Sequence, residues 1–179
     1  QKETFLPFAD IFRYKMLYEN GGYWTDLDMI AIKQFDFNQP FVFSSERTIQ
    51  KGAYKNVNHP FLPIIGVLKA PPKSAFYLEL YETCMAYEKK GINKDKLKYM
   101  KILRKMIDKY NYHKYVKLPK LFCHLDWWYA KDAFIIRDDH KFFKEKYGVK
   151  GKSASSMFSG TYSVHFWRDL VTKKYKLDL

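Results

Sequence analysis

The sequence has few cysteines, few glycines and prolines, and no long apolar run, and each shortage excludes a class of protein. Two cysteines in 179 residues, Cys84 and Cys123, are too few for a disulfide framework or a four-cysteine zinc site. They favour a reducing, cytoplasmic compartment. The 8 glycines and 7 prolines are too few for a collagen-like or low-complexity chain. No apolar run approaches the ~18 residues of a transmembrane helix, and the start of the chain has no secretory signal pattern.

Hydrophobic and aromatic residues are abundant instead. They make up 47% and 19% of the chain, which excludes intrinsic disorder because so many large side chains require burial. The length suits one ordinary domain, and no linker or internal repeat divides it. The sequence therefore predicts a single domain over residues 1–179.

Positive charge is concentrated in one part of the chain. The net charge is +13, and residues 88–120 contain twelve basic and three acidic side chains, whereas residues 1–46 contain four basic and seven acidic ones. A lysine-rich stretch of this kind is either a solvated helical face or a site that attracts an anionic surface or an acidic acceptor. Only five basic residues are arginines, and lysine lacks the planar fork that reads bases and phosphates. Nucleic acid is therefore the least expected partner.

Hydrophobic periodicity and turn residues predict alternating helices and strands, and hence an α/β domain. The expected helices cover residues 7–20, 74–89 and 93–110. The expected strands cover residues 23–25, 29–33, 41–43, 64–68, 115–118, 133–136 and 162–167.

The most informative chemistry lies in residues 8–33. Asp26 and Asp28 are separated by one residue, so their carboxylates share one face of a strand or converge in a turn. Carboxylate pairs suit Mn²⁺ or Mg²⁺, ions that also bind substrate phosphates. Gly21 and Gly22 precede the pair, and Asp10 and Arg13 lie one helical turn apart on the preceding helix.

This run resembles the sugar-binding region containing the DXD motif, which marks glycosyltransferase family 32 and its relatives, among them capsular-polysaccharide transferases and the catalytic domains of clostridial glucosylating toxins. The resemblance rests on Ala9-Asp10, Ile11-Phe12, Arg13, Gly21-Gly22, Tyr23-Trp24, Asp26 and Asp28. Weaker similarities follow in residues 40–43, 64–72, 116–122 and 162–170, the last resembling the family's terminal His-x-Trp element.

The resemblance implies a role for each matched residue. Asp10 and Arg13 would contact the nucleotide, and Asp28 would bind the metal. Asp26 would bind the metal or the ribose. Tyr23 and Trp24 stand in the nucleotide-sugar site, with Trp24 where the family usually has Tyr. His165 would reach the diphosphate or the metal, and Trp167 would close over the donor.

The function implied is metal-dependent sugar transfer, with retention, from a UDP- or GDP-sugar to a glycan or protein acceptor, as in polysaccharide biosynthesis. The implied fold is the GT-A type, a Rossmann-like mixed sheet flanked by helices. Family members carry a βαβ segment before the first helix, whereas only seven residues precede Phe8 here. We therefore expect a fragment of a longer domain, a late register, or a sheet completed by another chain.

Two rival interpretations remain open at this stage. One is a basic module that binds an anionic membrane or nucleic acid, with an incidental DXD. The other is a degenerate, non-catalytic transferase-like subunit. We interpret Glu46 as a surface residue, and Asp126 as equally suited to an acceptor pocket beside Trp127 and Trp128 or to a location next to a tryptophan core.

Overall fold

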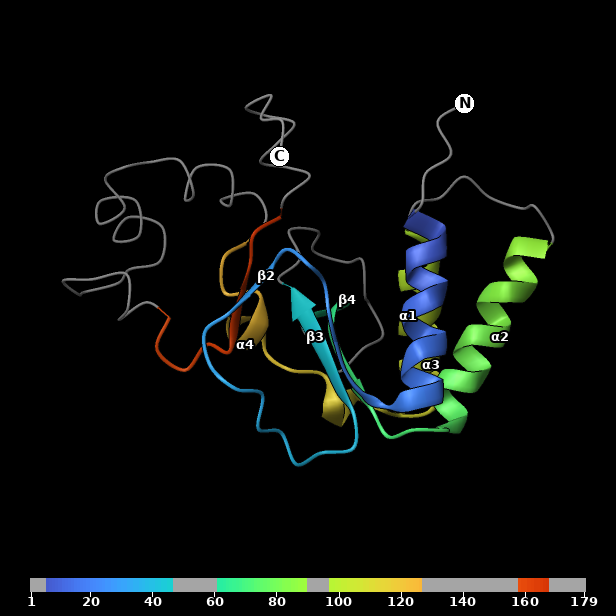
Figure 1. Ribbon diagram of the computed structural model, residues 1–179, viewed down its shortest axis with the longest axis horizontal. Coiled ribbons are helices and arrows are strands. Elements are labelled where there is room, and N and C mark those ends of the chain that lie inside the picture. The colour runs from blue at the N-terminus through green and yellow to red at the C-terminus, as the bar shows by residue number, and fades with distance from the viewer. Residues whose placement is uncertain (1–5, 47–60, 90–96, 127–157, 168–179) are drawn as a thin grey trace, which may run out of the picture.

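The computed structural model describes residues 6–46, 61–89, 97–126 and 158–167 (Figure 1). The helices are α1 (Leu6–Asn20), α2 (Ala75–Lys89), α3 (Lys98–Lys109) and α4 (Pro119–Phe122), with a 3₁₀ turn at His113–Tyr115. The strands are β1 (Gly22–Thr25), β2 (Met29–Ala31), β3 (Val42–Glu46), β4 (Leu62–Ala70) and β5 (Ser163–His165). The predicted mixture of helices and strands is confirmed. Within these residues no helix is long and apolar enough to cross a membrane.

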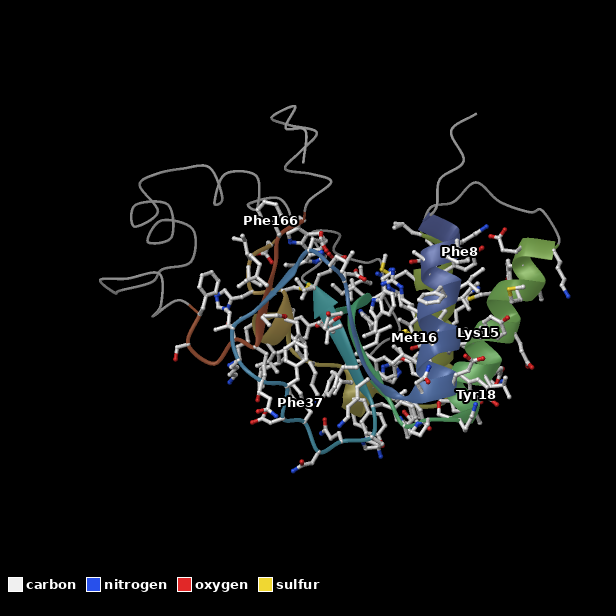
Figure 2. All side chains as sticks on the ribbon, in the orientation of Figure 1. Phe8, Lys15, Met16, Tyr18, Phe37 and Phe166 are labelled. Atoms are coloured by element: carbon white, nitrogen blue, oxygen red, sulfur yellow. The ribbon has the colours of Figure 1, made fainter. Side chains whose placement is uncertain are left out.

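The described part of the chain forms three layers, of which a three-stranded sheet is the middle one (Figure 1). In that sheet β4 lies between β1 and β3 and pairs antiparallel with both. Helices α1, α2 and α3 cover one face, and α4 with the antiparallel pair β2–β5 covers the other. In Figure 2, Lys15, Met16 and Tyr18 lie on α1, while Phe37 and Phe166 lie on the side of β2 and α4.

Alternation along the strands divides the core into two clusters. Phe43 and Leu68 point to the three helices, whereas their neighbours Val42 and Val67 point to α4. Burial on both faces explains why β4 has an almost continuous apolar sequence. The sheet is thereby fixed between two apolar layers, which fixes the positions of the loops at its edge.

The two glycines after α1 turn the chain back into the sheet. Gly21 and Gly22 have φ angles of +66° and +79°, which side chains rarely adopt, and the Gly21 N–H donates to the Leu17 carbonyl at 2.9 Å. A Cβ on Gly21 would lie 2.5 Å from the backbone nitrogen of Pro72. Gly21 is therefore required both by its conformation and by this close approach.

Several expected elements agree with the structure, and others do not. Ser74 caps α2 by accepting the Tyr77 N–H at 3.2 Å, as the sequence predicts. The strand expected from Ile64 begins at Leu62 instead, and it includes Pro63. β1 pairs only with the C-terminal part of β4, so at Pro63 the strand has β3 as its single neighbour. Proline is tolerated there because it lies at an edge of the sheet.

The strand expected at residues 115–118 is wrong. The 3₁₀ turn extends to Tyr115, Val116 makes a single parallel bridge to Phe43, and α4 begins at Pro119. Proline at the first helical position favours this helix start, which ends the extended segment after one bridge. The strand expected at 133–136 and the start of the helix at 93–96 lie outside the described residues, as do Trp127 and Trp128.

The strand arrangement is simpler than the expected one. Both described sheets are antiparallel, and the Phe43–Val116 bridge is parallel. The described chain is therefore a mixed α/β structure, and the GT-A arrangement stays a prediction.

Candidate functional site

Asp26 and Asp28 lie in the tight turn that joins β1 to β2. The Asp26 N–H donates to the Gly66 carbonyl at 2.9 Å, and the Met29 N–H donates to the Asp26 carbonyl at 3.1 Å. Leu27, between the two acids, is fully exposed at the tip of the turn. The sequence allows the two carboxylates either to share one face of a strand or to converge in a turn, and in the structure they lie in a turn.

Strand β5 brings His165 to this turn. His165 is in register with Met29, and the Phe166 N–H donates to the Asp28 carbonyl at 2.8 Å. The His165 Nε2 then lies 3.2 Å from the Asp28 Oδ1. One ligand atom each from Asp26, Asp28 and His165 lie within 4.8 Å of one another. The structure therefore brings together all three predicted metal ligands.

Trp167 stacks on His165 just beyond the strand. The two ring centroids are 3.8 Å apart with 25° between the planes, and the Trp167 Nε1 donates to the Leu125 carbonyl at 3.2 Å. The expected strand to residue 167 ends at His165, because Trp167 has a φ of +54°. The turn at Trp167, rather than strand alternation, places the indole over the imidazole.

Arg13 connects α1 to the carboxylates. Its guanidinium donates to the Asp10 Oδ1 at 2.9 Å, to the Asp26 Oδ1 at 2.7 Å and to the Ile65 carbonyl at 3.0 Å. Asp10 and Arg13 are 7% and 6% exposed, so this is a buried ion-pair network.

Burial raises the pKa of the two acids that Arg13 contacts. Loss of hydration raises the pKa of Asp10 to about 6, although the Arg13 charge opposes the shift. The pKa of Asp26 is also raised, chiefly by burial, against the opposing effects of Arg13 and of the hydrogen bond from Trp24. A second cation beside Asp26 would offset the cost of burying its charge.

The neighbouring aromatics Tyr23 and Trp24 point to opposite faces of the sheet. Trp24 packs on the helix side, and its Nε1 donates to the Asp26 Oδ1 at 2.9 Å. Tyr23 packs on the other side, 5.5 Å from the Phe35 ring. Of the two aromatic residues expected in the site, the structure places Trp24 in contact with the carboxylates.

Glu46 and Asp126 are two further acids near the end of β3 and after α4, for which the sequence indicated a surface position and two alternative environments, respectively. The interpretation of Glu46 as a surface residue is wrong, because it is half-buried at the end of β3 and burial raises its pKa to about 7. The charges of Arg104 and His165 oppose this shift. Asp126 is buried. The signal available for Glu46 was its position directly after a strand that is buried on both faces.

The lysine-rich helix is partly neutralised within the protein. On α3, Lys98 pairs with Glu88 at 2.6 Å, and Lys109 pairs with Glu79. Lys101 and Lys105 are exposed on the same helix. The positive surface of α3 is therefore smaller than the residue count implies.

The three site residues suit a hard divalent cation. The two carboxylates are oxygen ligands of the kind that hold Mn²⁺ or Mg²⁺, and the buried Nδ1 of His165 leaves Nε2 as a nitrogen ligand facing Asp28, which suits a transition metal such as Mn²⁺ better than Mg²⁺. These three ligand atoms therefore fit the predicted divalent metal, and the identity of the metal stays a proposal.

Comparison with known proteins agrees with the predicted resemblance. No curated protein and no solved structure matches the chain. Residues 2–48 match the family described as glycosyltransferase sugar-binding region containing DXD motif. This match confirms the predicted family resemblance for the segment that carries Asp10, Arg13, Asp26 and Asp28, and it supports a glycosyltransferase-like function.

Proposed function

We propose that the protein transfers a sugar from a UDP- or GDP-sugar to a glycan or protein acceptor, in a reaction that depends on Mn²⁺ or Mg²⁺. The observation that carries the proposal is the cluster of Asp26, Asp28 and His165, assembled from two distant parts of the chain. Asp26 and Asp28 lie in the segment that matches the family, and His165 lies outside it. Retention of the anomeric configuration is the outcome that the resemblance implies.

The chemistry of sugar transfer explains why such a cluster is useful. Departure of the sugar leaves negative charge on a nucleoside diphosphate, and a divalent cation held by Asp26, Asp28 and His165 would stabilise that charge. Trp167 packs on His165 and limits the positions that the imidazole can adopt. By closing over the donor, as the resemblance implies, the indole would also exclude water from the diphosphate.

Asp10 and Arg13 would serve the donor from the other side of the site. Arg13 holds both carboxylates, which keeps Asp26 in place before the donor binds. The pKa of Asp10 is raised to about 6, so its carboxyl group can be charged or protonated near neutral pH. It would therefore either accept hydrogen bonds from the hydroxyl groups of the nucleotide sugar or donate one to them. We assign no enzymatic nucleophile.

The test is a screen of UDP- and GDP-sugars for Mn²⁺-dependent binding and donor hydrolysis, comparing the wild type with Asp28→Asn. The substitution removes the charge that holds the cation and nearly preserves the shape. We expect it to abolish metal-dependent nucleotide binding and transfer while the thermal unfolding temperature stays close to that of the wild type.

Asp36→Asn is the matched control. Asp36 is an exposed acid that accepts the Tyr162 hydroxyl at 2.7 Å, and the same substitution there should leave activity unchanged. Near-full activity of Asp28→Asn in Mn²⁺ would contradict the metal assignment. Tight donor binding by the wild type with no hydrolysis or transfer would instead favour the non-catalytic subunit.

A further inference from the structure

We propose that Trp24 is a positioning residue for Asp26, acting through its indole N–H rather than by stacking on a substrate. The proposal rests on the function proposed above and concerns how the Asp26 carboxylate is oriented toward a cation. It differs from the sequence-based expectation, in which Trp24 stands in the nucleotide-sugar site.

The first support is that two donors converge on a single oxygen atom of Asp26. The Trp24 Nε1 donates to Oδ1 at 2.9 Å, and the Arg13 Nη1 donates to the same oxygen at 2.7 Å. A carboxylate oxygen has two lone pairs, so these two hydrogen bonds occupy Oδ1. The other oxygen, Oδ2, is then the one available to a cation.

The second support is that the indole is itself fixed. The Arg13 guanidinium lies 5.0 Å from the Trp24 ring centroid, and the Phe12 ring meets it edge-on at 6.2 Å. Pairing of Trp24 with Leu68 in the sheet fixes the backbone. A ring that is held on several sides is suited to orienting another group, because little freedom is left to lose.

The third support is the space around Oδ2. A Cβ built on Gly66 would lie 3.9 Å from this oxygen, an ordinary van der Waals distance, so the glycine on β4 leaves Oδ2 uncrowded on that side. The two hydrogen bonds on Oδ1 hold the carboxylate plane of Asp26, and Gly66 leaves room beside Oδ2. Trp24, together with Arg13, therefore sets the orientation in which the Asp26 carboxylate stands beside Asp28 and His165.

The experiment measures the affinity of the full chain for Mn²⁺ alone, from the paramagnetic signal of the free ion. The first variant is Trp24→Phe. The second replaces Trp24 with benzothienylalanine, which keeps the shape of the indole and exchanges the N–H for sulfur. Removing a group that orients a metal ligand typically costs tenfold to a hundredfold in affinity. We expect a loss of about tenfold in both variants.

Phe12→Leu is the matched control, because it removes the ring contact on Trp24 and keeps the N–H. Its affinity for Mn²⁺ should stay within about twofold of the wild type. Wild-type affinity in the benzothienylalanine variant would overturn the proposal and return Trp24 to a ring contact. Equal losses in that variant and in Phe12→Leu would overturn it as well, because packing would then explain both.

Failure of the proposed function has a different signature. A wild-type chain that binds Mn²⁺ but transfers no sugar would contradict the transferase, while the Trp24 comparison would still decide the positioning role. A wild-type chain that binds neither Mn²⁺ nor Mg²⁺ would overturn both proposals. The indole N–H signal of Trp24 in a ¹⁵N spectrum should also move on Asp26→Asn if the hydrogen bond is present, with or without metal.

Discussion

The Nε2 atom of His165 lies 3.2 Å from the Oδ1 atom of Asp28, although 137 residues separate them along the chain. The antiparallel pairing of β5 with β2 produces this contact, because it sets His165 opposite Met29, the residue after Asp28. The imidazole is thereby held at the turn that carries both acids.

We predict that His165→Ala lowers the affinity for Mn²⁺ and the rate of donor hydrolysis by at least about tenfold, since one of three ligands is lost. Titration with Mn²⁺ and a hydrolysis assay measure the two effects. His113→Ala is the control. His113 follows α3 and pairs with Asp108 of that helix, and it does not belong to the cluster of Asp26, Asp28 and His165. Unchanged donor affinity and rate in His165→Ala would contradict the assignment.

Arg13 is predicted to be the main electrostatic support of the site. Arg13→Met leaves the buried Asp10 and the half-buried Asp26 without the cation that pairs with both, and loss of one partner of a buried ion pair typically costs about 3–5 kcal/mol in free energy of unfolding. Urea denaturation measures the loss. Lys15→Met, which breaks an exposed pair with Glu19 at 3.8 Å, should cost less than about 1 kcal/mol. Equal effects would contradict a buried network at Arg13.

The sequence predicts the local features of the site well, because they depend on spacing. The Asp10–Arg13 pair follows from helical periodicity, and the glycine turn and the two acids follow from the motif. The expectation that His165 reaches Asp28 rests on the family resemblance, and the structure has that contact.

The features that the sequence did not predict depend on packing between distant segments. The bond from Arg13 to Asp26 requires α1 to lie against the end of β1, and Glu46 is buried at the end of β3 near the charges of Arg104 and His165. Spacing along the chain carries no signal for the Arg13–Asp26 bond or for these neighbours of Glu46. The strand expected at residues 115–118 failed for a local reason, because Pro119 starts a helix there.

The two glycines after α1 allow a matched comparison. Both have positive φ angles, so alanine at either position carries the conformational cost, about 1–2 kcal/mol. A Cβ on Gly22 would meet nothing within 4 Å, whereas a Cβ on Gly21 would lie 2.5 Å from Pro72. We predict that Gly21→Ala is less stable than Gly22→Ala by a further 1–3 kcal/mol or so, measured by urea denaturation.

Mn²⁺ binding extends that comparison to the site, since Gly21 sets the start of β1 and therefore the position of Asp26. Gly21→Ala should weaken Mn²⁺ binding more than Gly22→Ala does. Equal stability of the two variants would contradict the close approach between Gly21 and Pro72.

Glu46 is predicted to make the protein less stable as the pH rises. Burial raises its pKa in the folded protein to about 7, against 4.5 in the unfolded chain, so the folded state binds the proton more tightly. The associated stability is fully present below pH 4.5 and is lost as the pH rises through 7. Each unit of pKa difference is worth about 1.4 kcal/mol, so the loss is at most roughly 3.5 kcal/mol.

Glu46→Gln keeps the shape and removes the titration. Plots of unfolding free energy against pH for the wild type and the variant should therefore diverge between pH 4.5 and 7, with the variant the more stable at pH 8. Taking the difference between the two curves cancels the parallel contribution of Asp10, whose pKa is also raised. Curves that stay parallel across this range would show that Glu46 has the same pKa in both states, and that the charges of Arg104 and His165 fully offset its burial.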